Sequence, residues 1–259
     1  MIINYIFLSI GFGISLLELL YGLSLYNLPS DIDRERGLSH VSNSIAGLIF
    51  MSITLGVITS ETFFTIPSLA DAKDFYNKVS HNLLGYQVGI ASVAARLQAT
   101  MILSPLVGLW ISMTWLLNLT TQTLIFIFYS LYILCIIIEW VFEFLVSLGI
   151  ALQVNDRTRS ISGSMIASPI VLRIFLSWLP KVDFIRVLET KEFPIKVPFQ
   201  EISEIILCLW NGQSGLLADG LEFIKIIVFI SFCWSLAILT IYGLSKAFGG
   251  IAHVISSRI

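Results

Sequence analysis

An uninterrupted stretch of 42 residues, 97–138, carries no Asp, Glu, Lys or Arg. As one α-helix it would measure roughly 63 Å, about twice the thickness of the hydrocarbon core of a bilayer. Its length and neutrality predict a chain that lies in a membrane. The stretch must also fold back if each half crosses once, and the polar residues 118–122 predict the turn, because their side chains compete with helical hydrogen bonding.

Composition extends this conclusion to the whole chain. Apolar residues make up 56% of the 259 and charged residues 12%, where soluble domains have about 45–50% and about 25%. The mean hydropathy is +0.89. These values exclude a soluble globular protein and predict a multi-pass protein of the cell membrane.

Segments of about 20 apolar residues predict an all-α fold, a polytopic transmembrane helical bundle of about six spans in a single integral membrane domain, 1–259. The expected spans are 2–26, 43–66, 97–117, 123–148, 160–180 and 223–245. The fifth is short and contains Pro169, so we expect a kink there. Residues 181–222 are expected to form an aqueous or interfacial segment, with a separate interfacial helix at 202–210. Residues 71–96 predict a further helix with a small-residue face.

The sequence patterns that mark most catalytic and metal-binding sites are absent. The three histidines are isolated, and the sequence contains no HExxH, no CxxC and no glycine-rich phosphate loop. We therefore expect no enzymatic activity, no cofactor and no metal. The net charge is -2 and no run of Lys or Arg occurs, which argues against autonomous nucleic-acid binding.

Four charges within or beside apolar segments are functional candidates: Glu18, Arg96, Glu139 and Glu143. A charge inside a membrane is costly unless it is paired or hydrated. Glu139 and Glu143 are four residues apart and share one helix face, where like charges repel. Three interpretations stay open for these side chains: an interfacial position, a structural ion pair, or part of a proton or ion pathway.

The most specific local pattern follows the fourth expected span. A helix runs out through Gly149, a short turn carries Arg157 and Arg159, and the chain re-enters through small residues that include Gly163. The small residues allow close helix packing, and the two arginines suit a phosphate headgroup layer or an acidic partner. On its own this pattern is typical of an ordinary helical hairpin.

The order of residues around this turn carries a family resemblance. The residues concerned are Leu148, Gly149, Leu152, Thr158, Arg159, Gly163, Ile166, Ala167 and Pro180. They resemble the hallmark of the TrbL-like family, the polytopic inner-membrane subunits of type IV secretion and conjugation systems, and of its archaeal CedA relatives in the crenarchaeal exchange-of-DNA import system. Relatives tend to have an Arg after the Leu and Pro before the Thr-Arg, where this chain has Gln153 and Asp156-Arg157.

The resemblance implies a non-enzymatic channel or platform subunit of a DNA import machine. It further implies a homo-oligomer whose partners are small pilin-like membrane proteins and a HerA-type ATPase. DNA would be the transported substrate, and 15 basic residues in 259 predict weak contact with it. Two other classes stay open: a small-solute or ion transporter that uses Glu18, Arg96, Glu139 and Glu143, and a structural membrane anchor subunit of a respiratory or filament complex.

We predict that Arg96 forms an ion pair with Glu139 or Glu143. A single reversal, Arg96→Glu or Glu139→Arg, should impair membrane assembly because it places like charges together. The double reversal should restore assembly, measured as the amount of protein extracted intact from membranes. If neither the Glu139 nor the Glu143 double variant recovers, the pairing is wrong.

Overall fold

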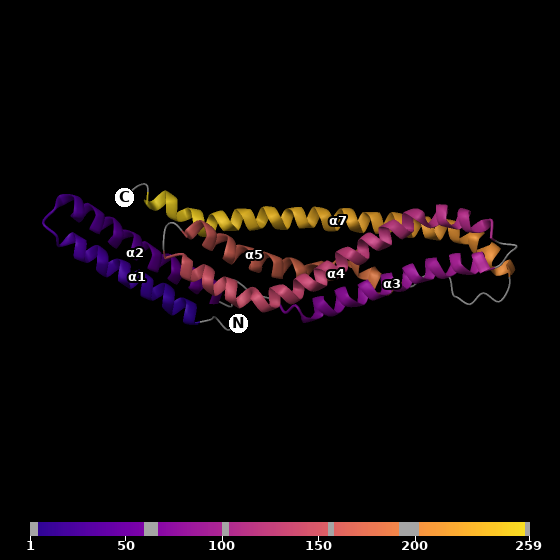
Figure 1. Cartoon of the computed structure of the whole chain (residues 1–259), viewed down its shortest axis with the longest axis horizontal. Coiled ribbons are helices and arrows are strands. Elements are labelled where there is room, and N and C mark those ends of the chain that lie inside the picture. The colour runs from indigo at the N-terminus through magenta and orange to yellow at the C-terminus, as the bar shows by residue number, and fades with distance from the viewer. Residues whose placement is uncertain (1–4, 60–66, 100–103, 155–157, 192–201, 257–259) are drawn as a thin grey trace. The chain divides into compact units, whose positions relative to one another are not determined.

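The computed structural model describes residues 5–59, 67–99, 104–154, 158–191 and 202–256, and their regular structure is entirely helical (Figure 1). The long helices are α1 (Tyr5–Tyr26), α2 (Asp31–Thr59), α3 (Ala70–Ala99), α4 (Leu106–Leu152), α5 (Arg159–Trp178) and α7 (Ile202–Ser256). Three short turns of helix follow α5: η1 (Leu179–Lys181), α6 (Asp183–Arg186) and η2 (Val187–Glu189). The predicted all-α fold class is confirmed.

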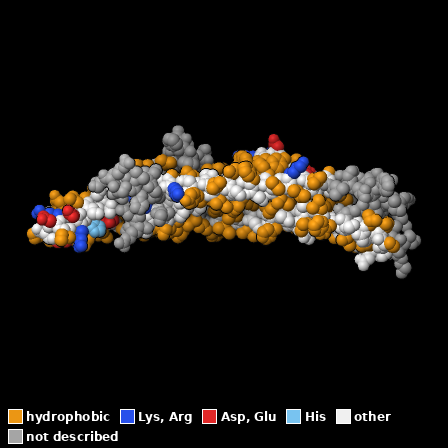
Figure 2. All heavy atoms as spheres, turned by 90° about the horizontal axis from the view of Figure 1, so that it is seen from above, with side chains coloured by type: hydrophobic (Ala, Val, Ile, Leu, Met, Phe, Trp, Pro, Cys, Tyr) orange, Lys and Arg blue, Asp and Glu red, His pale blue; other side chains and the backbone are white. Residues whose placement is uncertain are grey.

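Five of the described helical segments are long and apolar enough to cross a membrane. They are Ile6–Tyr26, Asp31–Thr59, Thr114–Leu152, Ile161–Lys181 and Ala218–Phe248. Large apolar side chains project from them, and Trp140 is 83% exposed. Figure 2 shows hydrophobic side chains over much of the visible face. A soluble monomer rarely exposes such patches, and the chain is an integral membrane protein built from apolar helices.

The predicted fold-back at 118–122 is wrong, because α4 runs without a break through these residues. The threonine hydroxyls in and around this segment donate to carbonyls one turn earlier in the same helix, as Thr120 does to Leu116 at 3.0 Å and Thr121 to Leu117 at 2.7 Å. Hydroxyls bonded in this way stop competing with the backbone ladder. The expected spans 97–117 and 123–148 are therefore not two helices joined by a turn.

Two other boundaries differ from the sequence prediction. Helix α2 begins at Asp31, twelve residues before the expected span 43–66, and residues 60–66 lie outside the described part. Asp31 and Asp33 occupy its first turn, where acidic side chains interact favourably with the helix dipole. Residues 202–210 are not a separate interfacial helix but the start of α7, which contains no proline to end it.

Internal contacts divide the chain into two compact units. Unit 1 comprises Met1–Pro67, Ile137–Phe175 and Ser235–Ile259, and unit 2 comprises Ser68–Ile136 and Leu176–Trp234. Helices α4, α5 and α7 contribute residues to both units.

In unit 1, α1 and α2 lie side by side with their backbones in close contact (Figure 1). A Cβ atom placed on Gly37 would lie 2.6 Å from the carbonyl oxygen of Gly22, so only glycine allows this approach. Farther along the same pair, the hydroxyls of Ser15 and Ser44 each donate to the other residue's carbonyl oxygen, at 3.2 and 2.6 Å. Close contact and buried hydrogen bonds together join the two helices.

Unit 2 is organised around aromatic side chains on α3 and α4. Tyr76 is fully buried, and its ring centroid lies 6.0 Å from that of Phe128. Its hydroxyl donates to the carbonyl oxygen of Leu176 at 2.7 Å, which satisfies a carbonyl near the end of α5. Tyr86, three turns further along α3, packs its ring edge-on against Phe223 of α7 at 5.6 Å. These contacts bring α3, α4 and α7 together in one core.

Helix α2 offers a matched pair of glycines for testing the close contact with α1. We expect Gly37→Ala to lower the free energy of unfolding by about 1–3 kcal/mol, because the added methyl group meets backbone atoms that have no room to move. Gly56→Ala is the control, since a Cβ there meets nothing within 4 Å, and alanine favours a helix by about 0.5–1 kcal/mol over glycine. Thermal unfolding of purified protein, followed by circular dichroism, measures both. Equal stability of the two variants would contradict the close packing.

Candidate functional site

Glu18, one of the charges selected from the sequence, is paired within unit 1. Its Oε1 lies 3.3 Å from Nδ1 of His40 on α2, and the ring of Tyr21 meets the His40 ring edge-on at 5.4 Å. Glu18 lies one turn before Gly22, and His40 lies one turn after Gly37, so the helix contact sets the pair. In an antiparallel helix pair that meets at two glycines, residues one turn outside the contact on each helix face each other. The positions of Gly22 and Gly37 could therefore have predicted His40 as the partner of Glu18.

Arg96, Glu139 and Glu143 keep their side chains exposed. Arg96 lies in the last turn of α3, in unit 2. Glu139 and Glu143 lie on α4 in the part that belongs to unit 1. The predicted pairing of Arg96 with either glutamate therefore stays a prediction.

The turn between α4 and α5 is built from the family-like residues. A Cβ on Gly149 would lie 2.7 Å from Cγ1 of Ile166, so the end of α4 and the start of α5 pack closely because residue 149 is glycine. The hydroxyl of Ser162 donates to the Gly149 carbonyl oxygen at 2.7 Å. Thr158 donates its hydroxyl to the carbonyl oxygen of Leu152 at 2.6 Å, which caps a carbonyl at the end of α4. Gly163 is buried in the first turns of α5.

Arg159 is only 4% exposed and lies inside unit 1. Its Nε donates to the backbone oxygen of Gln153 at 2.8 Å, and Nη2 lies 3.5 Å from the backbone oxygen of Asn43 on α2. The guanidinium carbon lies 5.4 Å from the centroid of the Phe50 ring. The expectation that Arg159 anchors the turn at a headgroup layer is wrong, because its buried guanidinium donates to backbone oxygens and joins α2, the end of α4 and α5. Arg157 lies outside the described residues.

Gln153 is a feature of this turn that sequence reasoning missed. Its side chain is 1% exposed, and neither amide atom has a hydrogen-bond partner within the described part of the chain. An unpaired buried amide costs about 1–3 kcal/mol. The turn therefore contains an unfavourable side chain on the same residue whose backbone oxygen holds Arg159.

A second charged cluster, in unit 2, joins α3, α7 and the segment after η2. Lys191 Nζ lies 2.6 Å from Oδ1 of Asp219 and also forms an ion pair with Glu222. Tyr86 on α3 donates its hydroxyl to the other oxygen of Asp219, and the Phe223 ring centroid lies 5.5 Å from the ammonium group. We call Tyr86, Lys191, Asp219 and Glu222 the lysine cluster.

Electrostatics favour the charged form of Lys191. Burial by itself would lower the pKa of this ammonium, but hydrogen bonds to Asp219 and Glu222 outweigh it, so the pKa lies above its usual value. Burial and the Asp219 hydrogen bond raise the pKa of Tyr86. The cluster thus holds one cation between two carboxylates, with the neutral phenol as a donor.

A neighbouring ion pair extends the cluster along α3. Lys78 Nζ lies 2.8 Å from Oε1 of Glu189, and Asn82 donates its amide to the Glu189 backbone oxygen at 2.6 Å. Lys78 and Asn82 are one turn apart on α3, so both reach the same short segment. The sequence prediction of an aqueous segment at 181–222 missed these contacts. A signal was present in Asp219 and Glu222, which lie three residues apart on one helix face.

Neither charged site assembles a metal centre among the residues that the structure describes. Comparison with protein-family models, with curated proteins and with solved structures gives no match to this chain. The resemblance at the turn therefore rests on the motif residues of the sequence alone.

Replacing Lys191 should destabilise unit 2, because it leaves two adjacent carboxylates without their cation. We expect Lys191→Met to lower the free energy of unfolding by about 1–3 kcal/mol at neutral pH. The control is Lys225→Met, which removes an exposed lysine from α7, the helix that carries Asp219 and Glu222. Thermal unfolding monitored by circular dichroism distinguishes the two variants, and equal losses would contradict the assignment.

The same pair of proteins tests the pH dependence. The pKa of Lys191 is raised on folding, so its contribution is fully present below the unfolded pKa of about 10.4 and is lost as pH rises through the folded value. The stability difference between wild type and Lys191→Met should stay constant around neutral pH and shrink in strongly alkaline solution. A difference that grows with alkaline pH would contradict this sign.

Proposed function

We propose that the chain is a non-enzymatic, multi-pass cell-membrane subunit of a conjugation-like DNA import machine related to type IV secretion systems. The observation that carries the proposal is the turn between α4 and α5. Gly149, Thr158 and Arg159, residues that carry the TrbL-like and CedA resemblance, each make a specific contact there. These three motif residues therefore build one packed turn, and the proposal rests on that turn together with the sequence resemblance.

The distribution of cations supports a weakly interacting conduit or platform. Lys78 and Lys191 are engaged by carboxylates, and Arg159 is bonded to backbone oxygens within unit 1. Arg173 donates to the Pro67 carbonyl oxygen at 3.0 Å and lies over the Phe142 ring. Because strong DNA binding needs clustered free cations, these side chains favour passage of DNA over retention.

Such a subunit needs other proteins to move its cargo. The sequence contains no phosphate-binding loop, so the energy for import would come from a HerA-type ATPase. Small pilin-like membrane proteins and further copies of this chain complete the proposed machine. The exposed apolar surface of the described helices, such as Phe126 and Trp140 on α4, offers contact area for lipid and for these partners.

The alternative small-solute or ion transporter would place Glu18, Arg96, Glu139 and Glu143 in an internal site. Glu18 pairs with His40, and the side chains of Glu139 and Glu143 are exposed. This placement gives less support to the transporter than the turn gives to the DNA import subunit. Nothing specific favours the structural anchor subunit over either.

The test is DNA uptake by a recipient strain from which the gene has been deleted. Uptake should be lost and should return with the wild-type gene. Arg159→Leu should fail to restore uptake, because the buried contacts to Gln153 and Asn43 are lost. Arg34→Leu, which removes an exposed arginine of α2, should restore it.

Membrane levels of each variant are measured by immunoblot, so that loss of the protein is separated from loss of function. A deletion strain that accepts DNA at the wild-type frequency would overturn the proposal. Purification of the wild-type protein should also recover an ATPase and small membrane proteins. Recovery of redox proteins instead would favour the anchor subunit.

A further inference from the structure

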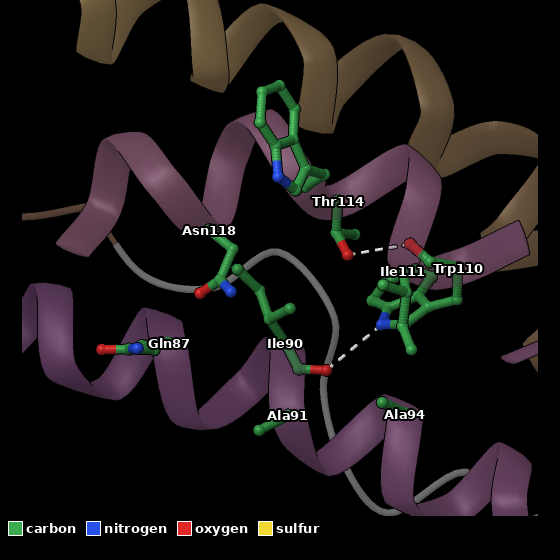
Figure 3. A pocket seen from close by; sticks show the side chains of 9 residues that line it. Gln87, Ile90, Ala91, Ala94, Trp110, Ile111, Thr114 and Asn118 are labelled. Carbon is green, nitrogen blue, oxygen red and sulfur yellow. Dashed lines mark hydrogen bonds between the residues drawn. The ribbon is translucent and has the colours of Figure 1, made fainter. Parts of the chain in front are cut away.

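A cavity of about 240 Å³ lies in unit 2 between α3 and the first turns of α4 (Figure 3). Helix α3 lines it with Gln87, Ala91 and Ala94, which follow one another at spacings of four and three residues and so share one face. The facing turns of α4 contribute Thr114, Trp115 and Asn118, with Asn118 one turn after the first two. The two alanines leave room that larger side chains would fill. We call this feature the α3–α4 groove.

Two of the polar groups that line the groove already form hydrogen bonds within the protein. The indole N–H of Trp110 donates to the Ile90 carbonyl oxygen at 3.2 Å, and Thr114 donates to the Trp110 carbonyl oxygen at 2.8 Å (Figure 3). The amides of Gln87 and Asn118 make no hydrogen bond to another described residue. Each amide therefore offers both a donor and an acceptor to a molecule in the groove.

Two tryptophans lie on the α4 side of the groove. Trp110 and Trp115 both lie in the first turns of α4, which begins at Leu106. Tryptophan is enriched at membrane–water interfaces, where the ring is in the apolar layer and the N–H reaches polar groups. Trp115 is 63% exposed. An exposed indole beside two amides offers a ligand both an apolar face and polar partners.

The lining selects for a neutral ligand with several hydroxyl groups. It contains no charged side chain, so nothing there offsets the charge of a phosphate or of a carboxylate. Two amides match hydroxyl groups, which donate and accept as amides do. The exposed indole ring of Trp115 provides a flat apolar surface against the carbon face of such a ligand. The volume is below the roughly 300–1,000 Å³ of sites for drug-sized molecules, which fits one small ring with its tail outside.

We propose that the α3–α4 groove binds a single neutral sugar group, with Gln87 and Asn118 hydrogen-bonding its hydroxyls and Trp115 covering its apolar face. The sugar comes from a glycolipid headgroup or from a free saccharide, which share this chemistry. The proposal does not depend on DNA import, because it concerns the residues of this groove alone.

The test uses full-length protein purified in a zwitterionic detergent, because a maltoside detergent carries sugars of its own. The protein is placed in phosphatidylcholine nanodiscs with or without monogalactosyl diacylglycerol, and retained lipid is counted by native mass spectrometry. A second arm titrates methyl galactoside and follows tryptophan fluorescence. We expect retention of the galactolipid over phosphatidylcholine. A response to methyl galactoside would show that the sugar suffices, and its absence would show that the lipid tail is also needed.

Variants distinguish the groove from the rest of the surface. Gln87→Leu and Asn118→Leu should each weaken galactolipid binding by about fivefold to tenfold, because each removes hydrogen bonds to the sugar. Gln98→Leu is the matched control, since it removes an exposed amide of α3 outside the groove, and its binding should stay unchanged. Equal retention of both lipids by the wild type together with no response to methyl galactoside would overturn the proposal. So would equal loss of binding in all three variants, or a second copy of this chain in the groove, detected by crosslinking from Ala91→Cys.

Discussion

Backbone and side-chain polar groups in an apolar environment must find hydrogen-bond partners within the protein, and this requirement governs the structure. It explains why the described regular structure is helical, since a helix satisfies its own backbone. It also explains α4, in which Thr120 and Thr121 return their hydroxyls to earlier carbonyls. Where a hydroxyl has no such local partner, it reaches across a helix contact, as Ser15 and Ser44 do. These serine and threonine hydroxyls therefore mark positions within helices and helix contacts rather than loops.

The same requirement links the candidate functional turn to the fold of unit 1. Close approach of α4 and α5 depends on Gly149, and it brings Ser162 and Thr158 within reach of carbonyls at the end of α4. Arg159 then follows α5 into the interior, where backbone oxygens of two other segments receive its N–H groups. The turn is thus a junction of three helices, and the buried Gln153 amide is the unfavourable group within it.

Local rules predicted some elements well and failed at others for identifiable reasons. Residues 2–26, 71–96 and 160–180 were predicted as helices, and α1, α3 and α5 follow these ranges closely. The turn expected at 118–122 was wrong because the prediction treated the polar side chains as helix-breaking. It did not include the hydrogen bonds that the threonine hydroxyls form to carbonyls of the same helix. Proline was the better signal, since Pro105 directly precedes α4 and α7 contains none. For the site, the close packing at Gly149 was predictable, whereas burial of Arg159 was not, because Phe50 and Asn43 are more than a hundred residues earlier.

The sequence alone determined that the chain lies in a membrane and is helical. Each property depends on values summed over neighbouring residues, such as the hydropathy of a span. Which groups meet was decided only by the tertiary structure. Glu18 and His40 pair because two glycines set the register of their helices, and Asp219 meets both Lys191 and Tyr86 because α3 and α7 pack in one unit. The α3–α4 groove exists for the same reason, since its two faces come from different helices. Which distant segments pair depends on how the helices pack, and a property summed over neighbouring residues does not contain that information.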